Sequence, residues 1–297
     1  MPRSLLALAA LVGCSDYEVK NLTVEDHFVQ DEYPPADVLF VVDNSASMVE
    51  EQERLGANFG AFVELLGSTT ANYRIGVTTT DPANGGVLVG PVLTPDTADV
   101  VAAFTAIVDV GVKGDRDEQG LAMGAMGVRS DVNPGFLRDS AYAHVVFVSD
   151  EDDHSAGDAE RYVDALRQSA PGAGVFAHAL VGDEPEGCLS GTSAAGAGSR
   201  YLAVADALGG LSESICADDY ALVLEAIGLV VSGWNPVFPL TEIAASETLE
   251  VNVDGVYLPE READGWHYSI GDNAVIFSGR AIPRPGMEVL VTYQRGG

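Results

Sequence analysis

The sequence predicts an α/β fold, a Rossmann-like, doubly wound and mostly parallel sheet, followed by a small all-β module. Short apolar runs rich in valine alternate with amphipathic segments of helical period, which is the order expected of strands and covering helices. The runs are continuously apolar, as in strands buried on both faces. Beyond residue 237 the apolar residues recur at every second position instead, which predicts the β module.

The α/β domain is expected over residues 36–232. Its first helix is predicted by Leu55, Phe59 and Phe62, which recur on one helical face. The expected strands and helices cover residues 38–42, 74–79, 144–149 and 174–181, and about 55–66, 98–107, 118–128, 158–168, 201–208 and 218–231, respectively. Ligand sites in such folds lie at the carboxyl ends of the strands, so the residues that follow the strands are the candidates for function.

The β module is expected over residues 237–297. Leu249, Val251 and Val253 alternate with polar residues, and the following Asp-Gly pair is typical of a hairpin turn. Further strands are expected at 266–270, 274–277 and 287–293. Four aromatic side chains of the module either form the core of a small sandwich or an exposed platform for a sugar or peptide: Trp266, Tyr268, Phe277 and Tyr293.

The first residues, "MPRSLLALAALVGC", have the order of a secretory signal, with a basic residue before a short apolar segment. The end of this stretch resembles the lipobox of bacterial lipoproteins, which implies that residues 1–13 are removed and that Cys14 is lipidated. Residues 14–35 are then a tether to the lipid. An ordinary signal peptide, or a buried helix with a chance cysteine, are the alternatives. Ser15, after the cysteine, points to the outer membrane by the same resemblance.

The chain has 3 cysteines, an odd number that leaves one unpaired in an oxidising compartment. If Cys14 carries lipid, Cys188 and Cys216 remain as a pair, and exported chains favour disulfides. Closing that loop stabilises a fold by about 3.5 kcal/mol on the chain-entropy account. Two buried thiols are the alternative.

The formal net charge is −30, from 45 acidic and 15 basic residues. A surface of this sign repels nucleic acid and anionic lipid headgroups, and it attracts divalent cations or basic partners. The composition therefore excludes nucleic-acid binding and leaves a cation site open.

Two strand ends carry candidate cation ligands. The stretch "DVLFVVDNSASM" ends an apolar strand with Asp43, Ser45 and Ser47, and "HVVFVSDEDD" ends another with Asp150. Carboxylate and hydroxyl oxygens suit Mg²⁺, Ca²⁺ or Mn²⁺ rather than zinc. The carboxyl ends of parallel strands lie at one edge of a sheet, so these side chains are expected to come together.

This pairing resembles a von Willebrand factor A domain over about residues 36 to 232. The run Ser149–Asp152 is similar to the T-D-G-E-D motif of bacterial members. The resemblance implies a metal-ion-dependent adhesion site in which Ser45 and Ser47 bind the metal directly. It also implies that Asp43 and Asp150 act directly or through water, and that one position stays open for a carboxylate of the ligand.

The sequence departs from the family at one ligand. A threonine is expected before the helix that starts within "GVKGDRDEQGLAMG", and that stretch contains none. Asp115 lies nearest the expected place, with Asp117 also in reach, and it is the tentative fifth ligand. Alternatively Thr78, Thr79 or Thr80 approaches from a strand end, although these residues equally suit the strand itself.

Two other patterns suggest different chemistry. "SGTSAAG" around Ser193 resembles the serine motif of subtilisin-type proteases, with Asp43, His154 and Ser193 in matching order. The surroundings of His154 do not match those proteases, and a Gly/Ser/Ala-rich loop explains the stretch more simply. His154 is either a metal ligand or a solvated loop residue.

The sequence thus predicts an extracytoplasmic lipoprotein that binds a protein partner through a divalent cation and performs no catalysis. The partner is expected to offer a carboxylate or a basic surface. The competing interpretation is a structural protein of the cell envelope whose Ca²⁺ or Mg²⁺ stabilises the fold. A serine hydrolase acting through Ser193 is a distant third.

Overall fold

The computed structural model describes residues 23–30, 35–68, 72–115, 117–170, 174–191, 193–232, 236–261, 265–278 and 281–296. The predicted signal peptide and Cys14 lie outside these residues. The chain divides into two compact units. The larger unit comprises Val29–Pro236 with Ile282–Met287. The smaller unit combines the residues before Val29 with Val237–Ala281 and Glu288–Gly297.

The larger unit is built on a parallel five-stranded sheet with the strand order β3-β2-β4-β5-β8. Its strands are β2 (Ala36–Val42), β3 (Tyr73–Thr79), β4 (Tyr142–Val148), β5 (Gly174–Val181) and β8 (Ser212–Ser214). Val42 pairs with Thr79 on one side and with Val148 on the other. The residues that follow β2, β3 and β4 therefore leave the sheet side by side.

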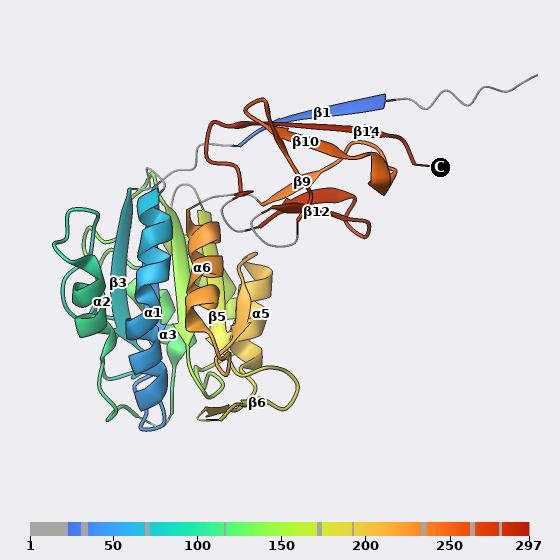
Figure 1. The fold of residues 1–297 in the computed structure, drawn as a ribbon. Coiled ribbons are helices and arrows are strands. Elements are labelled where there is room, and N and C mark those ends of the chain that lie inside the picture. Colours follow the sequence, from blue (N-terminus) through green and yellow to red (C-terminus); the bar gives the residue numbers. More distant parts are fainter. Residues whose placement is uncertain are drawn as a thin grey trace, which may run out of the picture. The chain divides into compact units, whose positions relative to one another are not determined.

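Helices cover both faces of this sheet (Figure 1). One face is packed by α1 (Val49–Ser68), α2 (Val100–Val108) and α6 (Tyr220–Val231). The other is packed by α3 (Gly120–Gly127), α4 (Ala159–Ser169) and α5 (Ser199–Ala207). Aspartates cap α2, α4 and α6, because the side chains of Asp99, Asp158 and Asp219 accept bonds from first-turn amides.

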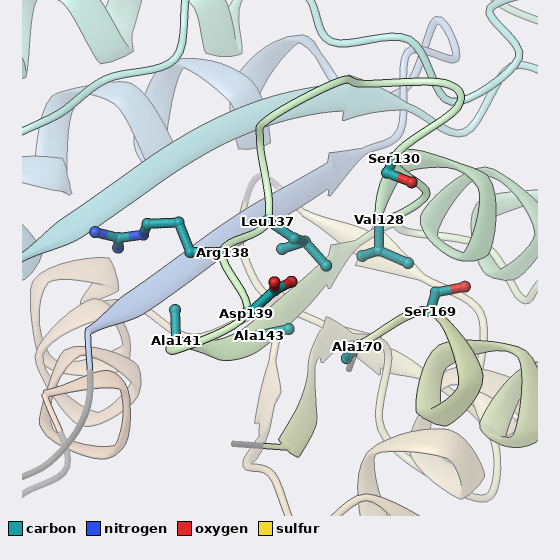
Figure 2. Close-up of a pocket in the computed structure, with 9 residues that line it drawn as sticks. All are labelled: Val128, Ser130, Leu137, Arg138, Asp139, Ala141, Ala143, Ser169 and Ala170. Atoms are coloured by element: carbon teal, nitrogen blue, oxygen red, sulfur yellow. The ribbon is translucent and has the colours of Figure 1, made fainter. Parts of the chain in front are cut away.

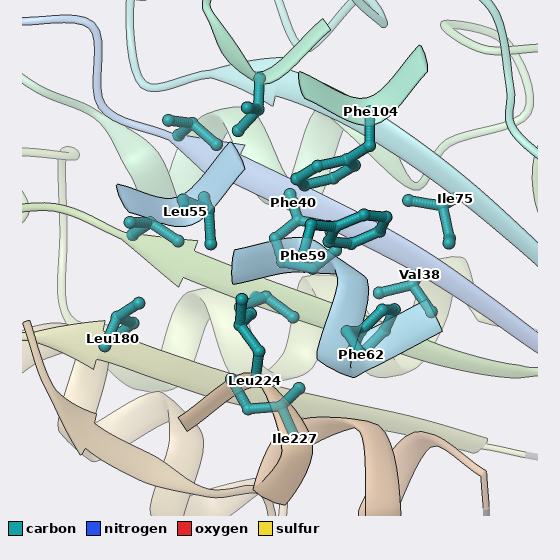
Figure 3. Close-up of a cluster of buried hydrophobic side chains, with 14 of the residues drawn as sticks. Val38, Phe40, Leu55, Phe59, Phe62, Ile75, Phe104, Leu180, Leu224 and Ile227 are labelled. Carbon is teal, nitrogen blue, oxygen red and sulfur yellow. The ribbon is translucent and has the colours of Figure 1, made fainter. Parts of the chain in front are cut away.

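Alternate residues of β2 point into two separate cores. Val38 and Phe40 belong to the cluster under α1, and Leu39 and Val41 belong to the cluster under α3. Figure 3 shows Phe40 among the rings of α1 and α2. The rings of Phe59 and Phe104 stack with centroids 3.4 Å apart, and Phe40 meets both edge-on. This burial on both faces explains the continuous apolar runs of the sequence.

The smaller unit is an all-β module of two sheets, ordered β1-β14-β10-β11 and β12-β13-β9. The strands are β1 (Thr23–Val29), β9 (Val237–Pro239), β10 (Glu250–Val253), β11 (Val256–Leu258), β12 (Trp266–Ser269), β13 (Ala274–Phe277) and β14 (Glu288–Gln294). The turn between β10 and β11 is the predicted hairpin, with positive φ at Asp254 and Gly255.

Strand β1 corrects the predicted tether, because residues 23–29 within the segment 14–35 pair with β14 instead of forming a linker. The carboxylate of Asp26 is buried there and accepts hydrogen bonds from the hydroxyls of Thr241 and Tyr293. Trp266, Phe277 and Tyr293 are buried, so these aromatic residues form core rather than an exposed platform.

Cys188 and Cys216 form the predicted disulfide across a sequence separation of 28. It joins the short β6–β7 hairpin (Cys188–Leu189 and Ala194–Ala195) to the segment that follows β8. Within the described residues, no helix has both the length and the apolar character needed to cross a bilayer.

Candidate metal centre

Asp43 leaves the carboxyl end of β2 with its backbone fixed between two neighbouring strands. Its amide donates to the carbonyl of Val148, and the amide of Thr80 donates to the carbonyl of Val42. The side-chain amide of Gln52, on α1, donates to the carbonyl of Asp43 over 2.8 Å. The loop after β2 is therefore anchored to β3, β4 and α1 before any ligand arrives.

The Asp43 carboxylate is fully buried, and both of its oxygens accept hydrogen bonds. Oδ1 accepts from the amide of Ser45 at 2.7 Å, and Oδ2 accepts from the hydroxyl of Ser149 at 2.7 Å. Burial raises the pKa of Asp43, although the bonds from Ser45 and Ser149 oppose that shift. Two donors thus hold this carboxylate in one orientation at the junction of β2 and β4.

The two serines and Asp150 complete the predicted set. The Ser45 and Ser47 hydroxyl oxygens lie 3.0 Å apart, and the Ser47 hydroxyl also hydrogen-bonds the Asp150 carboxylate. Burial raises the pKa of Asp150 to about 6, and the nearby charge of Asp43 adds a smaller part of this rise. The structure therefore brings Asp43, Ser45, Ser47 and Asp150 together at one edge of the sheet.

Several buried oxygens at this edge have no hydrogen-bond partner within the described residues. They are Oδ1 of Asp150, both carboxylate oxygens of Glu118 and the hydroxyl of Thr80. A buried acceptor without a donor costs about 1–3 kcal/mol, and more when it is charged. A hard divalent cation satisfies such oxygens, so the residues present fit Mg²⁺, Ca²⁺ or Mn²⁺.

No three His, Cys, Asp or Glu side chains of the described ranges form a group that holds a metal ion by themselves. The serine hydroxyls, with water, must then supply part of the coordination. This agrees with the ligand set that the sequence predicts, in which serine hydroxyls and aspartate carboxylates share the ion.

Glu118 is the residue at this edge that sequence reasoning missed. It lies two residues before α3, and only 1% of it is exposed. Burial and then the charge of Asp43 raise its pKa to about 8. Its position in the sequence was a signal, because Glu118 precedes the helix before which the family has its threonine. The spacing alone does not show whether the side chain of Glu118 is buried or exposed.

The tentative ligand Asp115 is exposed, and its Oδ1 accepts a hydrogen bond from the amide of Asp117. Asp117 is also exposed and lies 3.9 Å from Nδ1 of His154. The amide of Gly114, the residue before Asp115, donates to the carbonyl of Asn44, so the role of Asp115 as fifth ligand stays a prediction. Among the predicted threonines, Thr78 is bonded to Asn84, whereas the Thr80 hydroxyl is the unpartnered one.

The acidic run after β4 has two separate roles. Asp150 turns to the serines, whereas Asp153 accepts hydrogen bonds from the Leu121 amide and from Nε of Arg200. Asp153 therefore holds the start of α3 against α5. The amide of His154 donates to the carbonyl of Glu118 over 2.8 Å, which fixes the backbone of Glu118 beside the site.

Ser193 is not arranged as a catalytic serine. It is buried, its hydroxyl donates to Oε1 of Glu51 at 2.6 Å, and Nη1 of Arg54 donates to it. No hydrogen bond joins it to a histidine of the described residues. The hydroxyl instead attaches the disulfide-bounded segment to α1.

A cavity of about 110 Å³ lies away from this edge (Figure 2). Its lining includes Ala141 and Ala143, which flank the first residue of β4, whereas Asp150 follows the last residue of that strand. Arg138 on its rim is bound to the buried carboxylate of Asp37. The cavity is therefore separate from the candidate metal centre.

No protein-family model and no curated protein matches the chain. Solved structures do. The pilus adhesin SpaC from Lactobacillus rhamnosus GG, in its open conformation, is 12% identical with a TM-score of 0.52, over 92% of this chain and 40% of that one. Together with the sheet order and the two strand-end motifs, this likeness decides the fold. The larger unit has the von Willebrand factor A fold.

Two further structures are similar. A von Willebrand factor type A protein from Catenulispora acidiphila is 14% identical with a TM-score of 0.44, over 92% of this chain and 65% of that one. Proximal thread matrix protein 1 from the mussel byssus, with a zinc-occupied MIDAS motif, is 16% identical with a TM-score of 0.42, over 70% and 48%. The chain thus spans less than two thirds of each protein, and the von Willebrand factor A fold is the extent of the likeness.

Proposed function

We propose that the chain is an extracytoplasmic lipoprotein that binds a protein partner through a divalent cation held by Asp43, Ser45, Ser47 and Asp150. One observation carries the proposal. The ends of β2 and β4 are joined by the Ser149–Asp43 hydrogen bond, and the buried Oδ1 of Asp150 beside them has no donor among the residues that the structure describes. An oriented carboxylate next to an unsatisfied carboxylate oxygen is the arrangement that a cation completes.

In this proposal the hydroxyls of Ser45 and Ser47 bind the ion, and Asp43 and Asp150 balance its charge. The bound ion supplies a Lewis-acidic position to which an oxygen of the partner binds. Ser47 is exposed, so the ion would be reached from solvent on that side. The side chains of the site bind and orient, and none of them is required to transfer a proton.

Two features of the chain support a place in the cell envelope. The first residues have the order of a lipoprotein signal, Cys188 and Cys216 form a disulfide, and such bonds are typical of exported proteins. Lipid on Cys14 would anchor the chain without a membrane-spanning helix. SpaC is a pilus adhesin, but a likeness at 12% identity extends to the fold alone, so the proposal depends on the site residues.

A second candidate function is a cation that only stabilises the fold. The buried oxygens that have no partner among the described residues, Oδ1 of Asp150 and both carboxylate oxygens of Glu118, favour it, because an ion that satisfied them would stabilise the folded state by mass action. Under this alternative a cation raises the melting temperature, yet no protein binds the chain in a cation-dependent way.

The test compares wild type with Asp43→Ala as immobilised baits for envelope extracts, each with Mn²⁺ and with EDTA. The proposal predicts a protein that wild type retains only with Mn²⁺ and that the variant does not retain. Purified afterwards, that protein must bind wild type with the same cation dependence. Binding that EDTA abolishes in wild type but that persists in Asp43→Ala would contradict the assignment of the site.

A further inference from the structure

The β6–β7 hairpin lies outside the five-stranded sheet and depends on other elements for its position. Within the described residues, its two strands, Cys188–Leu189 and Ala194–Ala195, pair only with each other. A two-stranded hairpin by itself is marginally stable in water. The bonds that attach the hairpin to the rest of the larger unit therefore decide where it lies, and two of them lead to the candidate metal centre.

The first attachment is to the turn that carries Asp150. The amide of Gly196 donates to the carbonyl of Asp150 over 2.8 Å. The next residue, Ala197, bridges to Gly182 just after β5, and a Cβ added to Gly182 would lie 1.9 Å from the carbonyl oxygen of Gly196. Main chain thus touches main chain at this point, and the backbone of Asp150 is held against the second arm of the hairpin.

The second attachment is to the first turn of α1. The hydroxyl of Ser193 donates to Oε1 of Glu51 at 2.6 Å, and only 3% of Glu51 is exposed. The next residue, Gln52, donates to the carbonyl of Asp43. The charge of Glu51 also interacts with that of Asp150. Ser193 therefore binds the turn of α1 that supports the loop of Asp43.

The disulfide holds the hairpin over these two attachments. Cys188 begins the hairpin, and Cys216 lies between β8 and α6, with its Sγ 3.9 Å from the carbonyl oxygen of Ser193. Arg54 of α1 donates to the carbonyl of Ala217 and to the hydroxyl of Ser193. The covalent bond thus fixes the hairpin to the segment that Ser193 and α1 already contact.

We infer that the disulfide-bounded hairpin is the positioning element of the cation site, and that the Cys188–Cys216 bond strengthens cation binding by fixing that element. The inference rests on the proposed function, whose ligands the hairpin holds in place. With the bond open, the contacts of Gly196 and Ser193 exchange between made and broken. Only the fraction of chains with both contacts made presents Asp150 as the ion needs it, and the apparent affinity falls in proportion to that fraction.

This coupling makes the cation affinity depend on the oxidation state of the chain. Closing the bond removes two electrons and two protons from the thiols of Cys188 and Cys216, and a disulfide oxidant takes them up by thiol–disulfide exchange. Oxidising compartments outside the cytosol favour the disulfide, and the cytosol favours the thiols. The chain therefore reaches its full cation affinity after export. By reciprocity, a bound cation makes the bond harder to reduce by the same factor.

The first test is calorimetric titration of the purified chain with Mn²⁺ alone. Replacing Cys188 and Cys216 together by serine is expected to weaken binding about tenfold, as the loss of groups that support metal ligands does. Ser193→Ala, with the disulfide intact, is expected to weaken binding about threefold or more, and it keeps the test valid if the double variant does not fold. Wild-type affinity in the folded double variant, or in Ser193→Ala, would overturn the inference.

A matched control separates positioning from a general loss of stability. Leu166, on α4, is fully buried in the core on the other face of the sheet. Leu166→Ala is expected to lower the melting temperature at least as much as Ser193→Ala, yet to bind Mn²⁺ within about twofold of wild type. All titrations are made well below the melting temperatures. A loss of affinity in Leu166→Ala equal to that in Ser193→Ala would contradict a positioning role.

The second test measures the reciprocal effect on the disulfide. The oxidised chain is equilibrated with a series of dithiothreitol redox buffers, with saturating free Mn²⁺ or with EDTA, and thiol alkylation followed by mass spectrometry gives the reduced fraction. In wild type, Mn²⁺ is expected to raise the ratio of reduced to oxidised dithiothreitol at half reduction about tenfold. In Asp43→Ala, no change is expected. An unchanged midpoint in wild type, or an equal shift in Asp43→Ala, would overturn the coupling.

The outcomes separate this inference from the proposed function. Wild type that binds Mn²⁺, with an Asp43→Ala variant that does not, supports the site. If the hairpin variants then bind as tightly as wild type, the site stands and only the role of the hairpin is overturned. Wild type that binds no Mn²⁺ overturns the site and the inference together.

Discussion

The hydroxyl of Ser149 donates a 2.7 Å hydrogen bond to Oδ2 of Asp43, and so joins the ends of two neighbouring strands through residues 106 positions apart. The Ser45 amide binds the other oxygen of the same carboxylate. Groups held by such supporting bonds bind an ion without first having to be ordered. The cation site is therefore organised by the sheet itself.

Ser149→Ala is expected to weaken cation binding several-fold, because it releases the Asp43 carboxylate from one of its two donors. It also leaves a buried acceptor unsatisfied, which lowers the free energy of unfolding by about 1–2 kcal/mol. Calorimetry with Mn²⁺ and urea denaturation measure the two effects. Ser149→Thr keeps the hydroxyl and is expected to restore both; equal losses in the two variants would show that the hydroxyl is not the cause.

Helix α6 offers a matched pair of leucines for testing the core. Leu224 is fully buried in the cluster under α1, whereas Leu222 is 63% exposed. Leu224→Ala is expected to lower the free energy of unfolding by about 2–5 kcal/mol, through lost burial and a cavity. Leu222→Ala is expected to change it by less than about 0.5 kcal/mol. Similar losses in chemical denaturation would contradict the packing of α6.

The sequence predicted the larger unit well because its signals are local. The four long parallel strands are largely apolar, and each of the six helices contributes apolar residues to the core within its own length. Strand β1 lacked such a signal. Its side chains are mostly polar or half-exposed, so no hydrophobic pattern within residues 23–29 predicts a strand. Its partner β14 lies near the other end of the sequence.

The candidate site was predicted in part, for the same reason. Asp43 and Asp150 directly follow apolar strands, and parallel pairing brings such positions together. Glu118 precedes a helix at the end of a loop, and it is positioned by tertiary bonds, from the His154 amide to its carbonyl and from the Gln119 amide to Thr80. That all these residues act as cation ligands stays a prediction.

The disulfide closes a loop between residues 28 positions apart, and its removal is expected to destabilise the larger unit. Replacing both Cys188 and Cys216 by serine should lower the free energy of unfolding by about 3.5 kcal/mol on the chain-entropy account. Urea denaturation of the double variant, beside oxidised wild type, measures this. A loss of less than about 1 kcal/mol would show that the loop is already confined without the bond.

Two histidines are buried side by side on β4 and β5. Nδ1 of His144 lies 3.1 Å from Nε2 of His178, whose Nδ1 accepts from the Leu211 amide. Nε2 of His178 is therefore the protonated nitrogen of a neutral ring, and it donates to His144. Burial lowers the pKa of His178 to about 4, and burial followed by the charge of His178 lowers the pKa of His144 well below its usual value.

These lowered values set the direction of a pH effect. The folded state holds fewer protons than the unfolded chain below pH 6.5, so the stabilising contribution of the pair is complete above pH 6.5 and is lost as the pH falls toward 4. Imidazole NMR shifts of His144 and His178 should stay constant from pH 8 to about 5.5. In urea the same rings should titrate near 6.5. Folded-state titration near 6.5 would contradict neutral burial.

The most direct test of the cation site is calorimetric titration of the purified chain with Mg²⁺, Ca²⁺ and Mn²⁺, with wild type beside Asp43→Ala. Circular dichroism of both proteins establishes that the variant is folded. The account predicts that wild type binds at least one of these ions and that Asp43→Ala binds none. Equal affinity in the two proteins, or no binding by wild type, would contradict a cation site at the ends of β2 and β4.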